Sequence, residues 1–266
     1  MGVCSALLDQ VILQPTKHSI STRGMTRREL ARANRGGSSL KFEVWTQKFD
    51  RYAAPRVNVL KLIGAGGRAE NASADPLPLW HCGGQVWTVN PPGFGRSPGS
   101  ASLANCVVSA EIAAETMLAE FPDTPLLLVG VSLGAALALH IATKYPVAAL
   151  AMRDVPDIRQ VIRARYGRYI VSWPWAAAFA QFGIPTELAS IANAARCRVP
   201  GLFVTARLDR VVPPTCQDKV INAFAGEHRV LPLPETEHGQ AIPGTQLREY
   251  VELQRWLKEK VIGNAV

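Results

Sequence analysis

The sequence lacks the residue patterns by which metal sites and disulfide frameworks are usually recognised. Its 266 residues include only five cysteines and five histidines. There is no Cys-x-x-Cys pair among them and no histidine spacing typical of zinc. We therefore expect no metal site. The odd number of scattered cysteines predicts reduced thiols and hence a cytoplasmic protein.

Long hydrophobic runs and a leader segment are also missing. No run approaches the roughly 20 apolar residues that cross a bilayer. The N-terminus has neither the apolar core nor the small-residue cleavage site of a signal peptide. Met1 and Gly2 begin like a myristoylation site, but Ala6 stands where serine or threonine is expected. These features predict a soluble protein without an integral membrane segment.

Acidic residues are scarcer than basic ones. The chain has 21 Asp and Glu against 29 Lys and Arg, a formal net charge of +8. Arginines gather in two stretches, 23–35 and 159–168. Because no recognised nucleic-acid-binding module accompanies them, we interpret them as a solvated basic face and expect no nucleic-acid partner. An attraction for anionic substrates or surfaces stays open.

Short apolar runs alternate with helical patterns through most of the chain, which predicts an α/β fold. The runs are typical of strands buried on both faces, and the last helical pattern is amphipathic. The alternation predicts a doubly wound, mostly parallel sheet. One earlier stretch, 40–47, alternates apolar and polar residues like an antiparallel strand. The runs are 57–63, 86–89, 126–129, 148–152, 202–205 and 230–233, and the helical patterns are 106–121, 133–145, 216–224 and 246–261.

Two segments fall outside this rhythm. Residues 1–39 form an N-terminal arm before a domain over 40–266, with a possible short edge strand at 11–15 and loop elsewhere. The segment from about 157 to 198 is basic and aromatic-rich. It is either a pair of packing helices or a short helical lid whose aromatics shape a substrate pocket. The pocket residues would then be Tyr166, Tyr169, Trp173 and Trp175.

The pattern Gly-x-Ser-x-Gly occurs twice, at 95–99 and 130–134. In a nucleophile elbow the serine stands on a tight strand-to-helix turn, and the next backbone N–H stabilises an oxyanion. Pro98 has no N–H, and no apolar strand leads into Ser97. A strand run precedes Ser132 and a helical pattern follows it. We therefore predict Ser132 as the nucleophile.

A serine hydroxyl needs an imidazole to take its proton and a carboxylate to orient that imidazole. On this fold the partners follow in the order serine, acid, histidine, in loops after later strands. Asp209 and His238 satisfy both conditions. Asp154, after the 148–152 strand, is the alternative acid.

The glycine-rich loop 64–67 follows the 57–63 strand and predicts the second oxyanion donor. We expect the N–H groups of Ala65 and Leu133 to form the oxyanion hole. The same loop, beginning Gly64-Ala65-Gly66, also matches the dinucleotide fingerprint and raises the alternative of an NAD(P)-binding protein. That alternative requires an acidic residue after the next strand, where Asn90 stands instead.

Over residues 40–261 these motifs resemble the α/β-hydrolase superfamily. The resemblance implies hydrolysis of an ester, amide or related acyl bond of a small molecule, without a cofactor. It also implies a short lid at 157–198. A non-catalytic binding or signalling module on the same fold is a further alternative. No oligomeric state is predicted. The resemblance rests on 64–67, 90–97, 130–134, 208–213 and 237–239, with Asn90 in place of the family's usual aspartate and Ile63 in place of its histidine.

Overall fold

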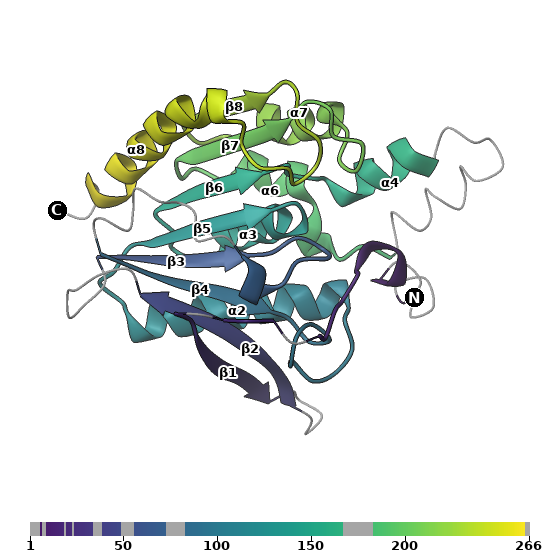
Figure 1. Cartoon of the computed structure of the whole chain (residues 1–266), viewed down its shortest axis with the longest axis vertical. Helices are drawn as coiled ribbons and strands as arrows, with labels where there is room; N and C mark the ends of the chain where they lie inside the picture. Colours follow the sequence, from purple (N-terminus) through teal and green to yellow (C-terminus); the bar gives the residue numbers. More distant parts are fainter. Residues whose placement is uncertain are drawn as a thin grey trace.

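An eight-stranded sheet in the order β1-β2-β4-β3-β5-β6-β7-β8 organises the protein (Figure 1). The computed structural model describes residues 6, 9–18, 20–22, 24–33, 39–48, 56–72, 83–166 and 183–263. β2 runs antiparallel to β1 and β4, and the strands from β4 to β8 are parallel to one another. The predicted doubly wound, mostly parallel α/β sheet is therefore confirmed. The strands are β1 (Thr26–Ala33), β2 (Ser39–Lys48), β3 (Val57–Leu62), β4 (Gly84–Asn90), β5 (Leu126–Val131), β6 (Ala149–Arg153), β7 (Gly201–Ala206) and β8 (His228–Leu233).

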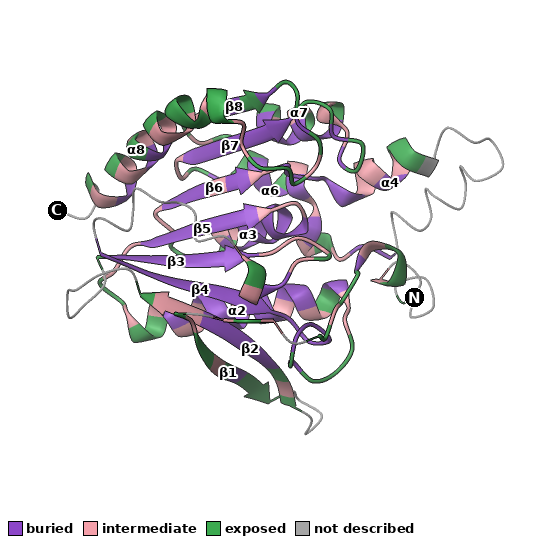
Figure 2. Ribbon diagram, in the orientation of Figure 1, coloured by how far each residue is buried: buried purple, intermediate pink, exposed green. Residues whose placement is uncertain are grey.

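Helices cover both faces of the sheet, which is why the central strands are apolar throughout (Figure 2). Leu60 of β3 and Leu128 of β5 belong to the core cluster shared with α2, α3, α6 and α7, whereas Val59 packs with α8 on the other face. Among the described helices, none is long and apolar enough to cross a membrane. The helices are α2 (Leu103–Glu120), α3 (Leu133–Lys144), α4 (Ile158–Tyr166), α6 (Ser190–Arg196), α7 (Pro214–Ala223) and α8 (Leu247–Gly263), with 3-10 turns η1 (Ala69–Asn71), η3 (Thr186–Leu188) and η4 (Gly244–Gln246).

The structure corrects the expectation for the N-terminal residues. Residues 26–33 were expected to be loop but form edge strand β1, in register with β2 from Thr26–Thr46 to Ala33–Ser39. The apolar pattern is weak because Leu30 alone is buried in this strand. Its arginines make ion pairs across the sheet edge: Arg28 with Glu120 and Arg32 with Glu115. Charged side chains of this kind also protect an exposed edge from further pairing.

The short edge strand expected at 11–15 is likewise wrong. Residues 9–12 are helical, and the Leu13 N–H donates to the Asp9 carbonyl at 2.8 Å. Pro15 follows directly and cannot donate to a strand ladder. Leu13 is 3% exposed and packs into the main core, so this segment is part of the folded body.

Candidate active site

The loops at the carboxyl ends of the parallel strands surround a cavity of about 480 Å³. Ser132, from the turn after β5, and His238, from the loop after β8, both line it. So do Gly64 and Ala65, after β3, and Leu133, the first residue of α3. Parallel strands place their carboxyl ends at one edge, where such folds bind ligands. The structure thus brings together segments that are distant along the chain.

Ser132 occupies a strained turn between β5 and α3. Its φ of 53° and ψ of −121° lie in a region that non-glycine residues rarely adopt. The Ser132 N–H donates to the Arg153 carbonyl of β6 at 2.9 Å. A Cβ on Gly130 would lie 2.5 Å from the Ala135 Cα, and one on Gly134 would overlap the Leu62 carbonyl. Both glycines of the motif are therefore required by close backbone approach.

The two predicted oxyanion donors flank this turn. A Cβ built on Gly64 would be 3.4 Å from the Ser132 Cβ, so the glycine-rich loop lies directly beside the serine. Leu133 begins α3, where the first N–H groups have no acceptor within the helix. Ala65 and Leu133 line the same cavity as the serine. Their N–H groups could therefore reach a carbonyl oxygen bound at Ser132.

His238 is held by Asp209. The His238 Nδ1 lies 2.6 Å from Asp209 Oδ2. The other carboxylate oxygen accepts the N–H groups of Val211 and Val212 at 2.8 and 2.7 Å, and Gln217 Nε2 donates to Oδ2 at 3.2 Å. Asp209 is buried, and these donors satisfy its charge. The arrangement directs the remaining imidazole nitrogen of His238 away from the carboxylate.

Asp154 has a different set of partners. It is fully buried, has a φ of 49°, and its nearest carboxylate oxygen is 3.9 Å from His238 Nδ1. Its oxygens accept the N–H groups of Ala206 at 2.9 Å and Gly239 at 3.0 Å. Asp154 therefore anchors the loop that carries His238, while Asp209 makes the hydrogen bond to the imidazole.

The surroundings of His238 favour its protonated form. Burial alone would lower its pKa, but the hydrogen bond that His238 donates to Asp209 and the negative charges of Asp209 and Asp154 outweigh burial, so the pKa of His238 is raised. The stabilisation from this pairing is fully present below the unfolded-state pKa of histidine. It is lost as the pH rises through the higher folded-state pKa.

Asp154, Asp209 and His238 also lie close enough together to form a possible set of cation ligands. One ligand atom from each of Asp154, Asp209 and His238 lies within 4.8 Å of the others. The four carboxylate oxygens already accept hydrogen bonds from backbone, amide or imidazole donors. The arrangement therefore fits a histidine oriented by hydrogen-bonded carboxylates better than a set of metal ligands with free lone pairs.

Ser97, of the other Gly-x-Ser-x-Gly stretch, has a structural role. It is buried, its hydroxyl donates to the Asn90 carbonyl at 2.7 Å, and its Oγ accepts the Glu43 N–H at 2.9 Å. Asn90 Nδ2 donates to Glu43 and Glu70, both at 2.7 Å, and its Oδ1 accepts the Ala69 N–H. An asparagine suits this position because it offers both donors and an acceptor.

The predicted lid residues are not tested by the structure. Tyr169, Trp173 and Trp175 lie outside the described residues, and the Tyr166 side chain, at the end of α4, is also outside them. Further residues line the cavity in the described part of the chain and were not identified from the sequence. They come from the N-terminal segment, from the loop after β6, from α4 and from the loop after β7: Val11, Ile12, Gln14, Pro156, Ile158, Val161, Ile162, Arg165, Val211 and Val212. The spacing of Ile158, Val161 and Ile162 marked one apolar helical face and was the available signal.

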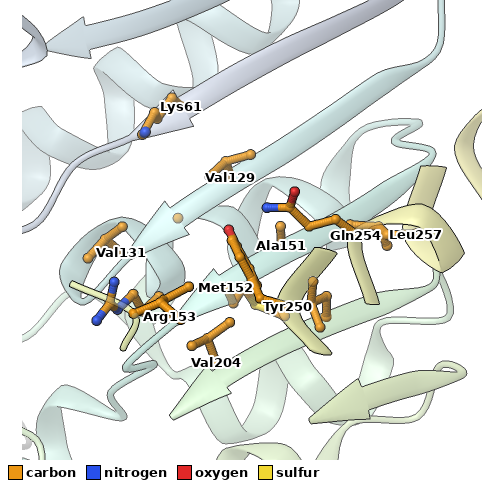
Figure 3. A pocket seen from close by; sticks show the side chains of 13 residues that line it. Lys61, Val129, Val131, Ala151, Met152, Arg153, Val204, Tyr250, Gln254 and Leu257 are labelled. Carbon is orange, nitrogen blue, oxygen red and sulfur yellow. The ribbon is translucent and has the colours of Figure 1, made fainter. Parts of the chain in front are cut away.

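A second, smaller cavity of about 80 Å³ lies beneath α8 (Figure 3). Figure 3 shows the Gln254 amide reaching from α8 over Val129 and Ala151 of the sheet. Among the described residues, Val131 alone lines both this cavity and the larger one. It contains neither Ser132 nor His238, so the chemistry predicted from the sequence belongs to the larger cavity.

Comparison with known proteins supports the fold over nearly the whole chain. The model of the alpha/beta hydrolase fold family matches residues 70–155. An esterase from Pyrococcus furiosus is 12% identical, with a TM-score of 0.69 over 95% of this chain and 98% of that one. Acetyl xylan esterase 1 from a Thermoanaerobacterium species is 13% identical, with a TM-score of 0.66 over 96% and 93%.

An acylaminoacyl peptidase from Pyrococcus horikoshii is also similar, with 12% identity and a TM-score of 0.63. That match covers 90% of this chain but only 42% of the peptidase. The sheet order, the helices on both faces and these similarities agree with the resemblance seen in the motifs. The chain therefore has the α/β-hydrolase fold.

Proposed function

We propose that this protein is a serine hydrolase that cleaves a carboxylic ester or related acyl bond through an acyl-enzyme. The observation that supports this most directly is the 2.6 Å contact between His238 and Asp209 at a cavity that Ser132 also lines. Ser132 stands on a strained turn at the start of α3 and lines the cavity, as the proposed nucleophile should.

In the proposed reaction His238 Nε2 takes the proton of the Ser132 hydroxyl as its Oγ attacks the substrate carbonyl carbon. The oxygen that becomes negative accepts hydrogen bonds from the N–H groups of Leu133 and Ala65. His238 then gives its proton to the leaving alcohol, and the C–O bond breaks to give the acyl-enzyme. Water, activated by the same histidine, releases the acid and regenerates the serine.

The known neighbours favour this chemistry over the alternatives. Two of them are esterases and one is a peptidase, which supports ester or amide bonds as the substrate class. A dinucleotide would need a ribose contact at the end of β4, but the Asn90 side chain there is fully buried and already hydrogen-bonded. A non-catalytic module would need no pairing of His238 with Asp209 beside Ser132.

A fluorophosphonate probe tests the proposal. We expect the wild-type protein to gain one covalent adduct by intact mass, mapped to Ser132 by peptide analysis. Ser132→Ala should gain none, whereas Ser100→Ala, which changes an exposed serine outside the cavity, should label like wild type. A folded wild-type protein that stays unlabelled would favour the binding module.

The pH dependence of hydrolysis should reflect the raised pKa of His238. Because only the neutral imidazole can accept the serine proton, kcat/KM should rise with pH through a midpoint above the ordinary 6.5 of histidine. Asp209→Asn removes the hydrogen bond and the charge that raise this pKa, so its midpoint should move to lower pH. A pH–rate profile from pH 5 to 9, roughly the range in which histidine titrates, measures both. An unchanged midpoint in the variant would contradict the assigned pairing.

A further inference from the structure

The N-terminal segment forms one wall of the cavity that holds Ser132. We call residues 9–18 the N-terminal strap. Val11, Ile12 and Gln14 of the strap line the cavity together with Ser132 and His238. Val11 is 60% exposed although it is apolar, whereas Leu13 is buried in the core. Val11 and Ile12 of the strap therefore line the cavity, while Leu13 fixes the strap by packing into the core. Figure 1 shows the N-terminal turn on the side where the parallel strands end.

Hydrogen bonds hold the strap at both ends. The Asp9 carboxylate accepts the Leu103 N–H at 2.8 Å, at the start of α2, where a negative charge is favourable. The Thr16 carbonyl accepts the Gly95 N–H at 3.0 Å and a bond from buried Arg68 at 2.9 Å. Arg68 also donates to the His18 carbonyl at 3.1 Å. A segment tied to the start of α2 and to two loops is a fixed wall of the cavity.

The strap also holds the glycine-rich loop. The Gln14 N–H donates to the Ala65 carbonyl at 3.1 Å, and a Cβ on Gly66 would lie 3.6 Å from Gln14 Oε1. Ala65 is the residue whose N–H is proposed as an oxyanion donor. Through this hydrogen bond the strap helps to position the peptide groups that would face the substrate carbonyl oxygen.

The lining from α4 and from the loop after β7 is also mostly apolar. It comprises Ile158, Val161 and Ile162 of α4 with Val211 and Val212 after β7, and Arg165 of α4 adds one charged side chain. In the proposed reaction the leaving oxygen must face His238, because that residue protonates it. The acyl group is the part of the substrate that remains to contact the wall beside the glycine-rich loop. A cavity lined mostly by apolar side chains favours a hydrocarbon acyl chain through burial of its surface.

We propose that the N-terminal strap is an acyl-binding subsite. The substrate class it assigns is an ester with an apolar acyl chain, whose accepted length is set by Ile12. Through Gln14 the strap also positions the Ala65 loop. This inference rests on the proposed serine hydrolase function and adds the substrate class and the residues that select it.

A series of p-nitrophenyl esters from acetate through butyrate and hexanoate to octanoate tests the subsite. Ile12→Ala should enlarge it and raise the ratio of kcat/KM for octanoate over butyrate by about 10-fold, while Ile12→Trp should lower that ratio by a similar factor. Val230→Ala shortens an exposed apolar side chain on β8, outside the cavity, and should leave the ratio unchanged.

Gln14→Pro tests the positioning role, because proline removes the N–H that bonds to Ala65, whereas Gln14→Ala keeps it. We expect Gln14→Pro to lower kcat by about 10-fold for every ester with little change in KM, relative to Gln14→Ala. Thermal unfolding of both variants checks that they are folded.

The outcomes separate this inference from the proposed function. A wild-type protein that is folded but neither labels nor hydrolyses any ester would refute the proposed function itself. If wild type is active and the Ile12 variants change all esters by one common factor, the subsite assignment is wrong. A shift that follows the alcohol part of the ester and not the acyl chain would also overturn it.

Discussion

Asp209→Asn is expected to lower kcat/KM for ester hydrolysis by about 10³- to 10⁴-fold, whereas Asp154→Asn should lower it by only about 10-fold. The two variants should differ because Asp209 Oδ2 lies 2.6 Å from His238 Nδ1, whereas Asp154 Oδ2 lies 3.9 Å from it. The Asp209 carboxylate accepts the hydrogen bond from His238 Nδ1–H and stabilises the imidazolium, whereas an amide provides no negative charge. Asp154 accepts hydrogen bonds from the backbone N–H groups of Ala206 and Gly239, so its loss acts through the position of the loop and through a weaker charge effect on His238.

Steady-state kinetics on one ester measures both variants, and thermal unfolding serves as the control for folding. Asp209 and Asp154 are both buried, so the pair is matched in burial, charge and chemical change. The assignment is refuted if the Asp154 variant loses more activity than the Asp209 variant while both remain folded.

Gly134→Ala is expected to destabilise the folded protein by about 3 kcal/mol or more and to reduce hydrolysis even at temperatures where it remains folded. A methyl group at residue 134 would overlap the Leu62 carbonyl of β3. Backbone cannot yield as a side chain can, so α3 would have to move away from the sheet. That movement would carry Ser132 and Leu133 with it, because they lie at the start of α3.

Gly244→Ala is the matched control, since a Cβ there meets no atom within 4 Å. It should change the free energy of unfolding by less than about 1 kcal/mol. Urea unfolding of the two variants measures the difference. Equal stabilities would mean that α3 and β3 do not approach as closely as the structure places them.

The turn at Ser132 could be predicted from the sequence because its requirements are local. An aliphatic strand run, small residues and a helical pattern occupy adjacent positions around Ser132, and the strained φ of 53° agrees with that interpretation. Asp209 and His238 could be proposed as candidates because each follows an apolar strand run. Their 2.6 Å contact could not be predicted, since Asp154 also follows a strand.

Strand β1 and the N-terminal strap show why the rest was missed. The hydrophobic pattern of β1 is masked by arginines, which suit an exposed edge and are paired by Glu120 and Glu115 on α2. The strap contains Val11, Ile12 and Leu13 in succession, and their spacing alone favours a strand. Only the position of Asp9 at the start of α2 and of Gln14 beside Ala65 explains its helical turn and its role.

By itself the sequence determined the order of the parallel strands with most of the helices between them, the glycines of the turn at Ser132 and the types of residue that end the strands. These features depend on neighbours within a few positions, through backbone sterics and burial periodicity. The tertiary structure decided which carboxylate meets His238 and which residues enclose Ser132. Such contacts join loops from separate strands, and their distances depend on how the whole sheet twists and packs.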